Sequence, residues 1–451
     1  MNASRRPLPW ALAALVVLLA VGLRHHFVWG AGRPVLGVAL HVWLGIGEAL
    51  GVVAFTVLGA RAWTAFVDRA PRITTTELLR AGSVVAVVAA LLPPGLSSDV
   101  FDYVARGRVE VHYGGNPYVT PPAALGVDDP VLALAEWPEF VMPYGPISAL
   151  AQAACALVAG PVPWLGVFLF KLLCAAAHVA TGWLLSRAVP PERAPAALAL
   201  WLFHPWILLE SCVSGHNEAL LALWLALMVE RAVRGKYTAA TFAFGLAVLT
   251  KHGCAPIGPL LLAAAVRARR AGAFAAGVLA SAALTALLAW RYFTEPGAFA
   301  FLTDQTANRG TSLQHFVILL AGPGAAGPLL WSGYAVTIAM VAAAAARVRD
   351  VAAFADRSVL VLAVFILVAM PLFSPWYHLW WAPLAAVLPA AAPGARALRA
   401  LAWLGPLSYL VYAATRRLDL VHQAWAWPIG ALLPVGIVLL ARRPPAAPVA
   451  A

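Results

Sequence analysis

Apolar runs recur along the whole chain, and the longer ones, of about 15–25 residues, have the length that an α-helix needs to cross the hydrocarbon core of a membrane. Of the 451 residues, 62% are hydrophobic and only 11% are charged, whereas a soluble domain carries about 25% charged residues. So much apolar surface cannot be buried in one soluble core, so lipid must surround most of the chain. The pattern predicts an all-α polytopic membrane protein with roughly 12–14 transmembrane helices. The runs lie at 10–23, 34–59, 81–92, 143–160, 164–185, 196–209, 219–229, 238–249, 256–266, 274–290, 329–346, 359–373, 379–392, 398–413 and 425–440.

The chain is interpreted as a single integral-membrane domain, 1–451, because no soluble domain, heptad array or solenoid repeat interrupts the apolar runs. Two long polar intervals stand out, at 97–143 and 291–315. The Ala-rich tail at 443–451 is expected to be disordered.

The net charge of +12 raises the question of nucleic-acid binding. The arginines, however, lie mostly in short loops between apolar runs, as the positive-inside rule predicts for cytoplasmic loops, so no nucleic-acid partner is expected. Arg5 and Arg6 precede the first run, which is predicted to be an uncleaved span with a cytoplasmic N-terminus. Both polar intervals are then extracytoplasmic, in a protein of a plasma membrane.

One region does not fit a simple alternation of crossings. The interval 97–143 and the segment around His216 are both predicted outside, yet three apolar runs separate them, at 143–160, 164–185 and 196–209. Three full crossings cannot join two segments on the same side. One of the three runs is therefore expected to be a short or re-entrant helix, and the sequence does not say which.

The interval 97–143 opens with Ser97-Ser98-Asp99, directly after an apolar run. A serine there can cap a helix, which would place Asp99 in the first turn, Asp102 on the same face, and Arg106 within reach of Asp102. Apolar residues on the other side would let this helix lie along the membrane interface. Asp99 is the leading candidate for a catalytic carboxylate; the alternatives are that Asp99 only favours the helix N-terminus and that Asp102 only pairs with Arg106.

Metal and cofactor chemistry find little support in the sequence. Asp99 and Asp102 have no nearby His or third carboxylate, so no metal site is predicted. The four cysteines all lie in apolar runs and are interpreted as small core residues.

Several motifs resemble, in order along most of the chain, those of bacterial mannosyltransferases that use polyprenyl-phosphate-mannose, including the α-1,6-mannopyranosyltransferases of actinobacterial lipoglycan synthesis. Glu218 stands where that family has Asp. The segments that carry the resemblance are Ser97-Ser98-Asp99-Val100, Tyr103, Gly107-Arg108, Gly115-Asn116-Pro117-Tyr118, Gly215-His216-Asn217-Glu218-Ala219-Leu220, Leu249-Thr250-Lys251 and Pro375-Trp376-Tyr377.

The resemblance implies a GT-C type fold in which the first outer loop is catalytic and one Asp, here Asp99, is the base. It also implies a polyprenyl-phosphate sugar donor, a glycan or glycolipid acceptor, and no cofactor. An inverting transfer needs one base to accept the proton of the acceptor hydroxyl, and a shielded cavity would raise the pKa of that base. The predicted donor- or acceptor-binding residues are Asp102, Tyr103, Arg106, Asn116, Tyr118, His216, Asn217, Lys251, His252, Arg309, Trp376, Tyr377 and His378.

Each binding candidate has a structural alternative. Lys251, with His252 beside it, suits a lipid phosphate, but it could instead snorkel to the interface. Arg309 could bind phosphate or be an ordinary loop arginine. His216-Asn217 could bind sugar or cap a helix, and Trp376-Tyr377-His378 could bind sugar or form an aromatic belt.

A different class of function, a transporter or lipid flippase, needs polar residues within the spans and favours an inverted repeat. Ionisable residues do occur in mid-run, at Glu48, Lys171 and His178, but no repeat is evident. A purely structural scaffold would leave the two polar intervals unexplained.

Overall fold

The computed structural model describes residues 38–94, 96–300 and 312–412, together with positions 11, 14, 17, 34 and 35. Apart from the two-residue strands β1 (Pro34–Val35) and β2 (Val38–Ala39), regular structure in these residues is helical. The expected all-α class is therefore confirmed. The predictions for Arg309, for the run at 425–440 and for the tail at 443–451 concern residues outside those that the structure describes.

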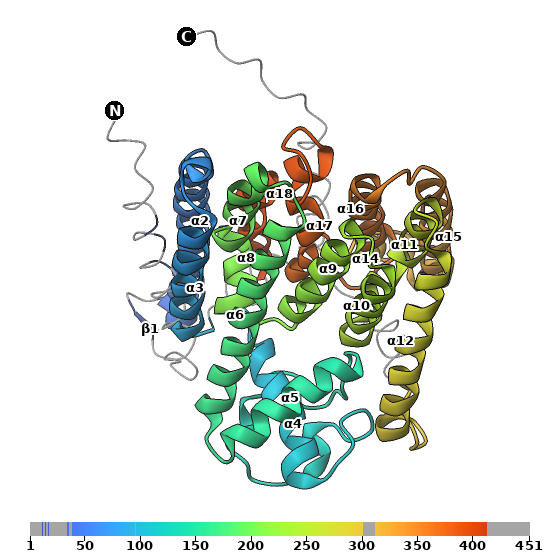
Figure 1. Cartoon of the computed structure of the whole chain (residues 1–451). Coiled ribbons are helices and arrows are strands. Elements are labelled where there is room, and N and C mark those ends of the chain that lie inside the picture. Colours follow the sequence, from blue (N-terminus) through green and yellow to red (C-terminus); the bar gives the residue numbers. More distant parts are fainter. Residues whose placement is uncertain are drawn as a thin grey trace.

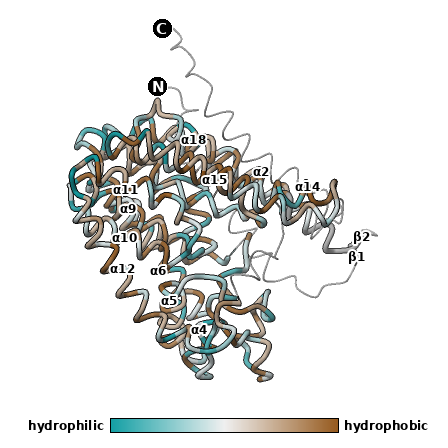
Figure 2. The backbone as a smooth tube through the Cα atoms, turned by 90° about the vertical axis from the view of Figure 1, so that its right-hand side faces the viewer, coloured by the Kyte–Doolittle hydropathy of each residue, from teal (hydrophilic) through white to brown (hydrophobic). Residues whose placement is uncertain are grey.

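The helices form a bundle with a small lobe at one end (Figure 1). The lobe contains α4 (Asp99–Tyr113) and α5 (Pro146–Ala159), and α4 and α5 also lie at the foot of the second view (Figure 2). The helices of the bundle are α2 (Leu40–Val67), α3 (Thr75–Leu91), α6 (Pro163–Arg187), α7 (Ala194–Leu202), α8 (Pro205–Leu208), α9 (Glu218–Val233), α10 (Tyr237–Thr250), α11 (Gly258–Arg267), α12 (Ala271–Tyr292), α14 (Leu313–Ala321), α15 (Ala326–Ala346), α16 (Val351–Val368), α17 (Ala382–Ala386), α18 (Pro393–Leu404) and α19 (Tyr409–Tyr412).

Within the described residues, five helices are long and apolar enough to cross a membrane, or six if one bent pair counts as a single span. The chain is thus a multi-pass membrane protein. Other apolar runs form helices that are shorter, such as the 14-residue α10. The total of roughly 12–14 crossings therefore stays a prediction. The five long helices are Gly45–Val67, Pro163–Arg187, Ala271–Tyr292, Pro323–Ala346 and Val351–Val368.

The structure accounts for the odd number of runs between the two outer segments. The run at 143–160 forms α5, which has 14 residues, well short of the ~20 that a span needs, and which packs along α4 in the lobe. Gly107 of α4 makes this packing possible, because a Cβ there would collide with the backbone of Gln152. The 25-residue α6 is long enough for one crossing, and the bent pair that follows supplies a second if it counts as a single span. Two crossings fit two segments that are predicted to lie on the same side.

A cluster of charged residues lies at the C-terminal ends of α6 and α9. Glu230, near the end of α9, is buried and pairs with Arg187 at 3.3 Å, with Arg231 at 3.3 Å and with Arg234 at 2.6 Å. Arg187 ends α6, so α6 and α9 bring their arginines to one end of the bundle. This grouping agrees with the cluster of basic loops that the sequence predicts for one face.

Two of the ionisable residues that favoured a transporter have backbone partners. Lys171 donates to the carbonyl of Leu92, just beyond the end of α3. The His178 Nε2 lies 3.3 Å from the carbonyl of Leu202. Both groups therefore satisfy helix ends inside the bundle.

Candidate active site

The carboxylate of Asp99 stands at the first residue of α4, as the sequence predicts. Its backbone N–H donates to Ser97 Oγ at 3.3 Å, and its Oδ2 accepts a hydrogen bond from the Tyr103 hydroxyl at 3.3 Å. Tyr103 is one helical turn further along α4 and is therefore on the same face. The Tyr103 ring packs between Tyr144 and Phe170, with ring centroids 5.4 and 5.1 Å apart. Rigid neighbours thus fix the direction of the Asp99 side chain.

A serine does satisfy a first-turn N–H of α4, because Ser97 Oγ accepts the Asp99 N–H, whereas Ser98 at the N-cap position makes no side-chain cap. Its hydroxyl instead donates to the Glu136 carboxylate. The first half of α4 is also more enclosed than a helix lying along the membrane surface. It is covered by α5, by α6 and by the loop that follows α4. Asp99 itself remains partly exposed.

The surroundings of Asp99 make it a better base than an ordinary carboxylate. Its pKa is raised to about 7, mainly by burial and also by the negative charges of Asp102, Glu218 and Glu136, while Lys251 acts in the opposite direction. A general base works best when its pKa lies near the working pH. Asp99 is therefore both positioned and tuned to accept a proton near neutral pH.

Lys251 is buried at the end of α10 and does not snorkel to the interface, so that alternative is wrong. Its ammonium forms an ion pair with Glu218, the first residue of α9. It also lies over the rings of Tyr144 and Tyr377, 4.9 Å from each centroid, and 5.8 Å from that of Trp380. An ammonium held this way is a strong point charge for a phosphate group.

The start of α5 is tied to the end of α10, and this brings Tyr144 over Lys251. The N–H of Gly145 donates to the carbonyl of Thr250 at 3.0 Å. A side chain at position 145 would strike the backbone of Leu249, so the close approach requires glycine. The lobe is thereby connected directly to the Lys251 site.

His216 and Asn217 lie beside the same site, in the turn before α9. His216 Nε2 is 3.0 Å from Ser97 Oγ, its Nδ1 is 2.8 Å from Glu210, and its ring stacks on Trp376 at 4.0 Å. Asn217 donates from Nδ2 to Ser148 Oγ at 3.0 Å and makes no side-chain cap on α9, so the capping alternative is wrong for it.

The aromatic segment η9 (Pro375–Trp380) is buried throughout, which rules out an aromatic belt facing the membrane interface. Trp376 covers His216, and Tyr377 stacks on Trp380 at 4.5 Å. His378 Nδ1 accepts a hydrogen bond from the indole N–H of Trp381 at 3.2 Å. Trp376 and Tyr377 therefore line the site, whereas His378 supports the segment from behind.

Asp102 and Arg106 form the predicted pair, 3.7 Å apart and almost fully buried. Asp102 accepts the backbone N–H groups of Trp137, at 2.9 Å, and Glu136, at 3.3 Å. Arg106 donates to the carbonyls of Trp137 and Phe140, each at 3.4 Å. The pair thus fastens the 136–140 segment onto α4, which supports the structural reading of both residues.

Asn116 and Tyr118 hold the outer loop in place. Asn116 Nδ2 donates to the carbonyl of Tyr292 at 2.8 Å, at the end of α12, and to Glu295 at 3.0 Å. The Tyr118 hydroxyl donates to the carbonyl of Tyr144 at 2.7 Å. His252 is exposed and does not share the buried position of Lys251.

The structure also places in the site residues that were not among the predicted catalytic or binding residues: Glu218, Tyr144, Glu136, Ser97 and Glu210. Glu218 lies within the motif that contains His216, and Tyr144 follows the proline at the end of the outer loop. Glu210 is a single acid within an apolar run, which is itself a signal of function in a membrane protein.

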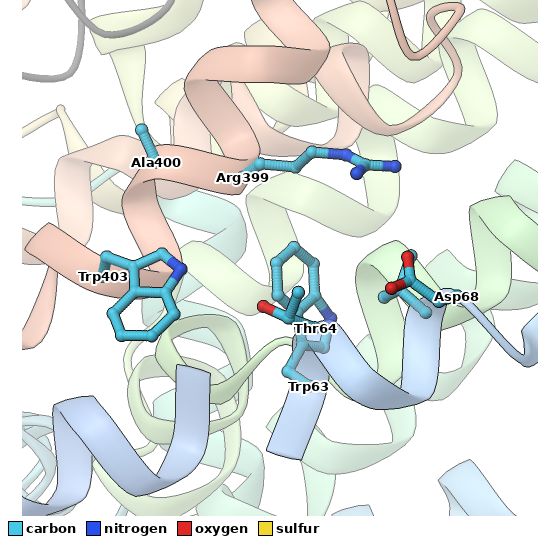
Figure 3. Close-up of a pocket in the computed structure, with 7 residues that line it drawn as sticks. Trp63, Thr64, Asp68, Arg399, Ala400 and Trp403 are labelled. Carbon is cyan, nitrogen blue, oxygen red and sulfur yellow. The ribbon is translucent and has the colours of Figure 1, made fainter. Parts of the chain in front are cut away.

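A cavity of about 270 Å³ lies elsewhere, between α2 and α18 (Figure 3). Trp63, Thr64, Asp68, Arg399 and Trp403 line it, and none of them is among the residues of the Asp99 site. Within the described residues, no group of three or more His, Cys, Asp or Glu side chains is arranged to hold a metal ion. The absence of a metal requirement remains a prediction.

The fold and the site define a multi-pass membrane protein with a tuned carboxylate and a buried cation at one end of its helix bundle. Residues 11–267 match the sequence model of the family described as "Alpha-(1->6)-mannopyranosyltransferase, N-terminal domain". The match covers more than half of the chain, so the chain belongs to this family and is a mannosyltransferase.

Two further similarities were found. The chain is 25% identical to alpha-(1->6)-mannopyranosyltransferase A of Mycobacterium tuberculosis over 478 aligned positions, which cover 93% of this chain and 86% of the relative. The crystal structure of ArnT from Cupriavidus metallidurans bound to undecaprenyl phosphate aligns with 81% of this chain and 76% of that chain, with a TM-score of 0.46 and 16% identity. The family match confirms the resemblance noted in the sequence.

Proposed function

We propose that this mannosyltransferase takes mannose from a polyprenyl-phosphate-linked donor and transfers it, with inversion, to an extracytoplasmic glycan or glycolipid. The observation that carries the proposal is that a base, Asp99, and a cation, Lys251, lie in the same site. Asp99 has a raised pKa of about 7, and Lys251 is close enough to lower it. One group suits the acceptor hydroxyl and the other suits the leaving phosphate.

In the proposed reaction, the Asp99 carboxylate accepts the proton of the acceptor hydroxyl as that oxygen attacks the anomeric carbon. The bond between that carbon and the phosphate oxygen breaks, and the electron pair leaves with the polyprenyl phosphate. Lys251 stabilises the negative charge that develops on the phosphate. Asp99 ends protonated and returns its proton to water.

A lipid-linked donor suits a site placed where the bundle meets the lobe, because the polyprenyl chain can stay in the membrane while its phosphate reaches Lys251. The arginines around Glu230 lie at the other ends of α6 and α9. By the positive-inside rule that end is cytoplasmic, which leaves Asp99 on the extracytoplasmic side. We place the protein in a bacterial plasma membrane, where an extracytoplasmic site has no access to nucleotide sugars.

The donor class is tested with purified protein in nanodiscs, supplied in parallel with radiolabelled polyprenyl-phosphate-mannose and GDP-mannose, and with an α-mannoside acceptor. Only the lipid-linked donor is expected to give a labelled product. Transfer from GDP-mannose alone would overturn the proposal.

The side of the site is tested in whole cells with a membrane-impermeant maleimide. The native cysteines Cys155, Cys174, Cys212 and Cys254 are all buried, so a cysteine introduced at an exposed position reports its own side. Glu139→Cys in the outer loop is expected to react, and Lys236→Cys at the other end of the bundle only after the membrane is permeabilised. The opposite pattern would place Asp99 in the cytoplasm.

A further inference from the structure

A bent pair of apolar helices lies beside the site. Residues Pro191–Leu202 and Pro205–Val213 are bent by 53°, at a point where Pro205 cannot donate a helical hydrogen bond. The second piece ends in a π-helical turn, η6 (Leu209–Val213). Such turns are frequently found at functional sites. This one places the carboxyl group of Glu210 inside the bundle, with no exposed surface.

A continuous series of polar contacts runs from Glu210 to the backbone of Asp99. The Tyr409 hydroxyl donates to Glu210 Oε2 at 3.2 Å, and the same oxygen lies 2.8 Å from His216 Nδ1. His216 Nε2 lies 3.0 Å from Ser97 Oγ, and Ser97 Oγ accepts the Asp99 N–H at 3.3 Å. Three segments far apart in sequence, 97–99, 210–216 and 409, therefore meet in one series of contacts that ends at the first residue of α4.

The donors and acceptors in this series fit a single direction. If the hydrogen of a neutral His216 is on Nδ1, which lies 2.8 Å from Glu210 Oε2 without hydrogen-bond geometry, its Nε2 is left as an acceptor. Ser97 then donates its hydroxyl hydrogen to Nε2, and its oxygen is free to accept the Asp99 N–H. A carboxylate on one side of a histidine commonly fixes which nitrogen carries the hydrogen, and so the direction of the bond on the other side.

We propose that Glu210 and His216 are positioning residues that fix the Ser97 hydroxyl and, through it, the first turn of α4 that carries Asp99. This inference rests on the proposed function of Asp99 as the base. It assigns His216 a role different from the sugar or phosphate contact predicted from the sequence. His216 Nε2 lies 3.0 Å from Ser97 Oγ, and Nδ1 lies 2.8 Å from Glu210 Oε2 without hydrogen-bond geometry. One face of the ring lies on Trp376, and the residue is fully buried.

A positioning role can be distinguished from a binding role by measuring kcat and KM separately. A residue that binds donor or acceptor raises KM when it is removed, whereas a residue that only aims the base lowers kcat. Ser97→Ala, His216→Asn and Glu210→Gln are each expected to lower kcat by roughly tenfold or more, because small errors in the placement of a catalytic group are costly. The KM for donor and for acceptor is expected to stay within about twofold.

Two control variants test whether a loss of activity comes only from a general loss of structure. Ser97→Thr keeps the hydroxyl and is expected to retain most of the activity that Ser97→Ala loses. Ser211→Ala changes the neighbour of Glu210 in the same π turn, and its hydroxyl has no hydrogen-bond partner among the described residues. It is expected to leave kcat and the melting temperature unchanged.

The decisive experiment is the double variant Ser97→Ala/Glu210→Gln. Residues that act through one series of contacts are not additive, so the double variant is expected to lose no more kcat than Ser97→Ala alone. Multiplied losses, a rise in donor KM in His216→Asn, or wild-type kcat in the single variants would each overturn the inference. If Asp99→Asn in the same assay keeps wild-type turnover, the proposed function fails instead, which separates the two outcomes.

Discussion

The Tyr103 hydroxyl donates a 3.3 Å hydrogen bond to Asp99 Oδ2 across one turn of α4. Because a hydrogen bond to an ionised carboxylate favours the charged form, this contact works against the burial that raises the pKa of Asp99. The enzyme thus has a base that is only partly exposed to water and is held in a defined direction.

Removing that hydroxyl gives a first prediction. Tyr103→Phe is expected to lower kcat about three- to tenfold, as the loss of one hydrogen bond to a charged group implies. It should also move the pH midpoint of activity upward. Tyr113→Phe is the matched control, because Tyr113 is on the same helix and its hydroxyl donates to the carboxylate of Asp129 at 2.6 Å, away from the site. Equal effects in the two variants would argue against a specific role for Tyr103.

The pH dependence of the enzyme follows from the raised pKa of Asp99. A protonated carboxyl cannot accept a proton, so kcat/KM is expected to fall about tenfold per pH unit below pH ~7 and to level off above it. Glu136→Gln removes one of the negative charges that raise this pKa. It is expected to shift the midpoint to lower pH. An activity that is constant from pH 5 to pH 8 would show that no group with this pKa is needed.

Replacing both members of the Lys251–Glu218 ion pair is expected to affect stability and donor binding differently. Lys251→Gln leaves a buried carboxylate without its partner, which costs about 3–5 kcal/mol. The double variant Lys251→Gln/Glu218→Gln is expected to recover most of that loss in thermal unfolding, yet to bind the polyprenyl phosphate at least tenfold more weakly. If the double variant binds polyprenyl phosphate as the wild type does, Lys251 is not the phosphate cation.

Arg106 is predicted to act on stability. Arg106→Ala leaves Asp102 buried and unpaired and frees the carbonyls of Trp137 and Phe140, so the melting temperature should fall by several degrees. Arg291→Ala removes a pair with Glu110 whose arginine is 55% exposed, and its effect on the melting temperature should be small. Similar losses of melting temperature in the two variants would show that the buried pair contributes no more to stability than the exposed pair.

The sequence was a good guide to local features. The start of a helix at Asp99, the pairing of Asp102 with Arg106 and the need for one short helix before His216 all follow from residue spacing and span length, and all are present. These features depend on neighbours within one or two turns, or on the length of a single segment. Local propensity and hydropathy are sufficient to predict them.

The parts of the site that depend on tertiary packing could not be predicted in the same way. Tyr409 and Glu210 are 199 positions apart, and no pattern in the sequence connects them. Lys251 looked free to reach the interface because nothing local indicates that Tyr144, Tyr377 and Trp380 surround it. The sequence also suggested ligand contacts for Asn116 and Tyr118, whereas both hold the outer loop against distant backbone.

The role of Asp99 as the base is tested most directly by Asp99→Asn, which keeps the shape of the side chain and removes its ability to accept a proton. Donor affinity and single-turnover mannose transfer from polyprenyl-phosphate-mannose are measured on the same preparation, with Asp128→Asn in the exposed part of the outer loop as the control. The variant is expected to bind the donor as the wild type does and to transfer mannose about 10²–10⁴-fold more slowly. Transfer by Asp99→Asn within about threefold of the wild-type rate, less than the loss of a general base implies, would contradict the account.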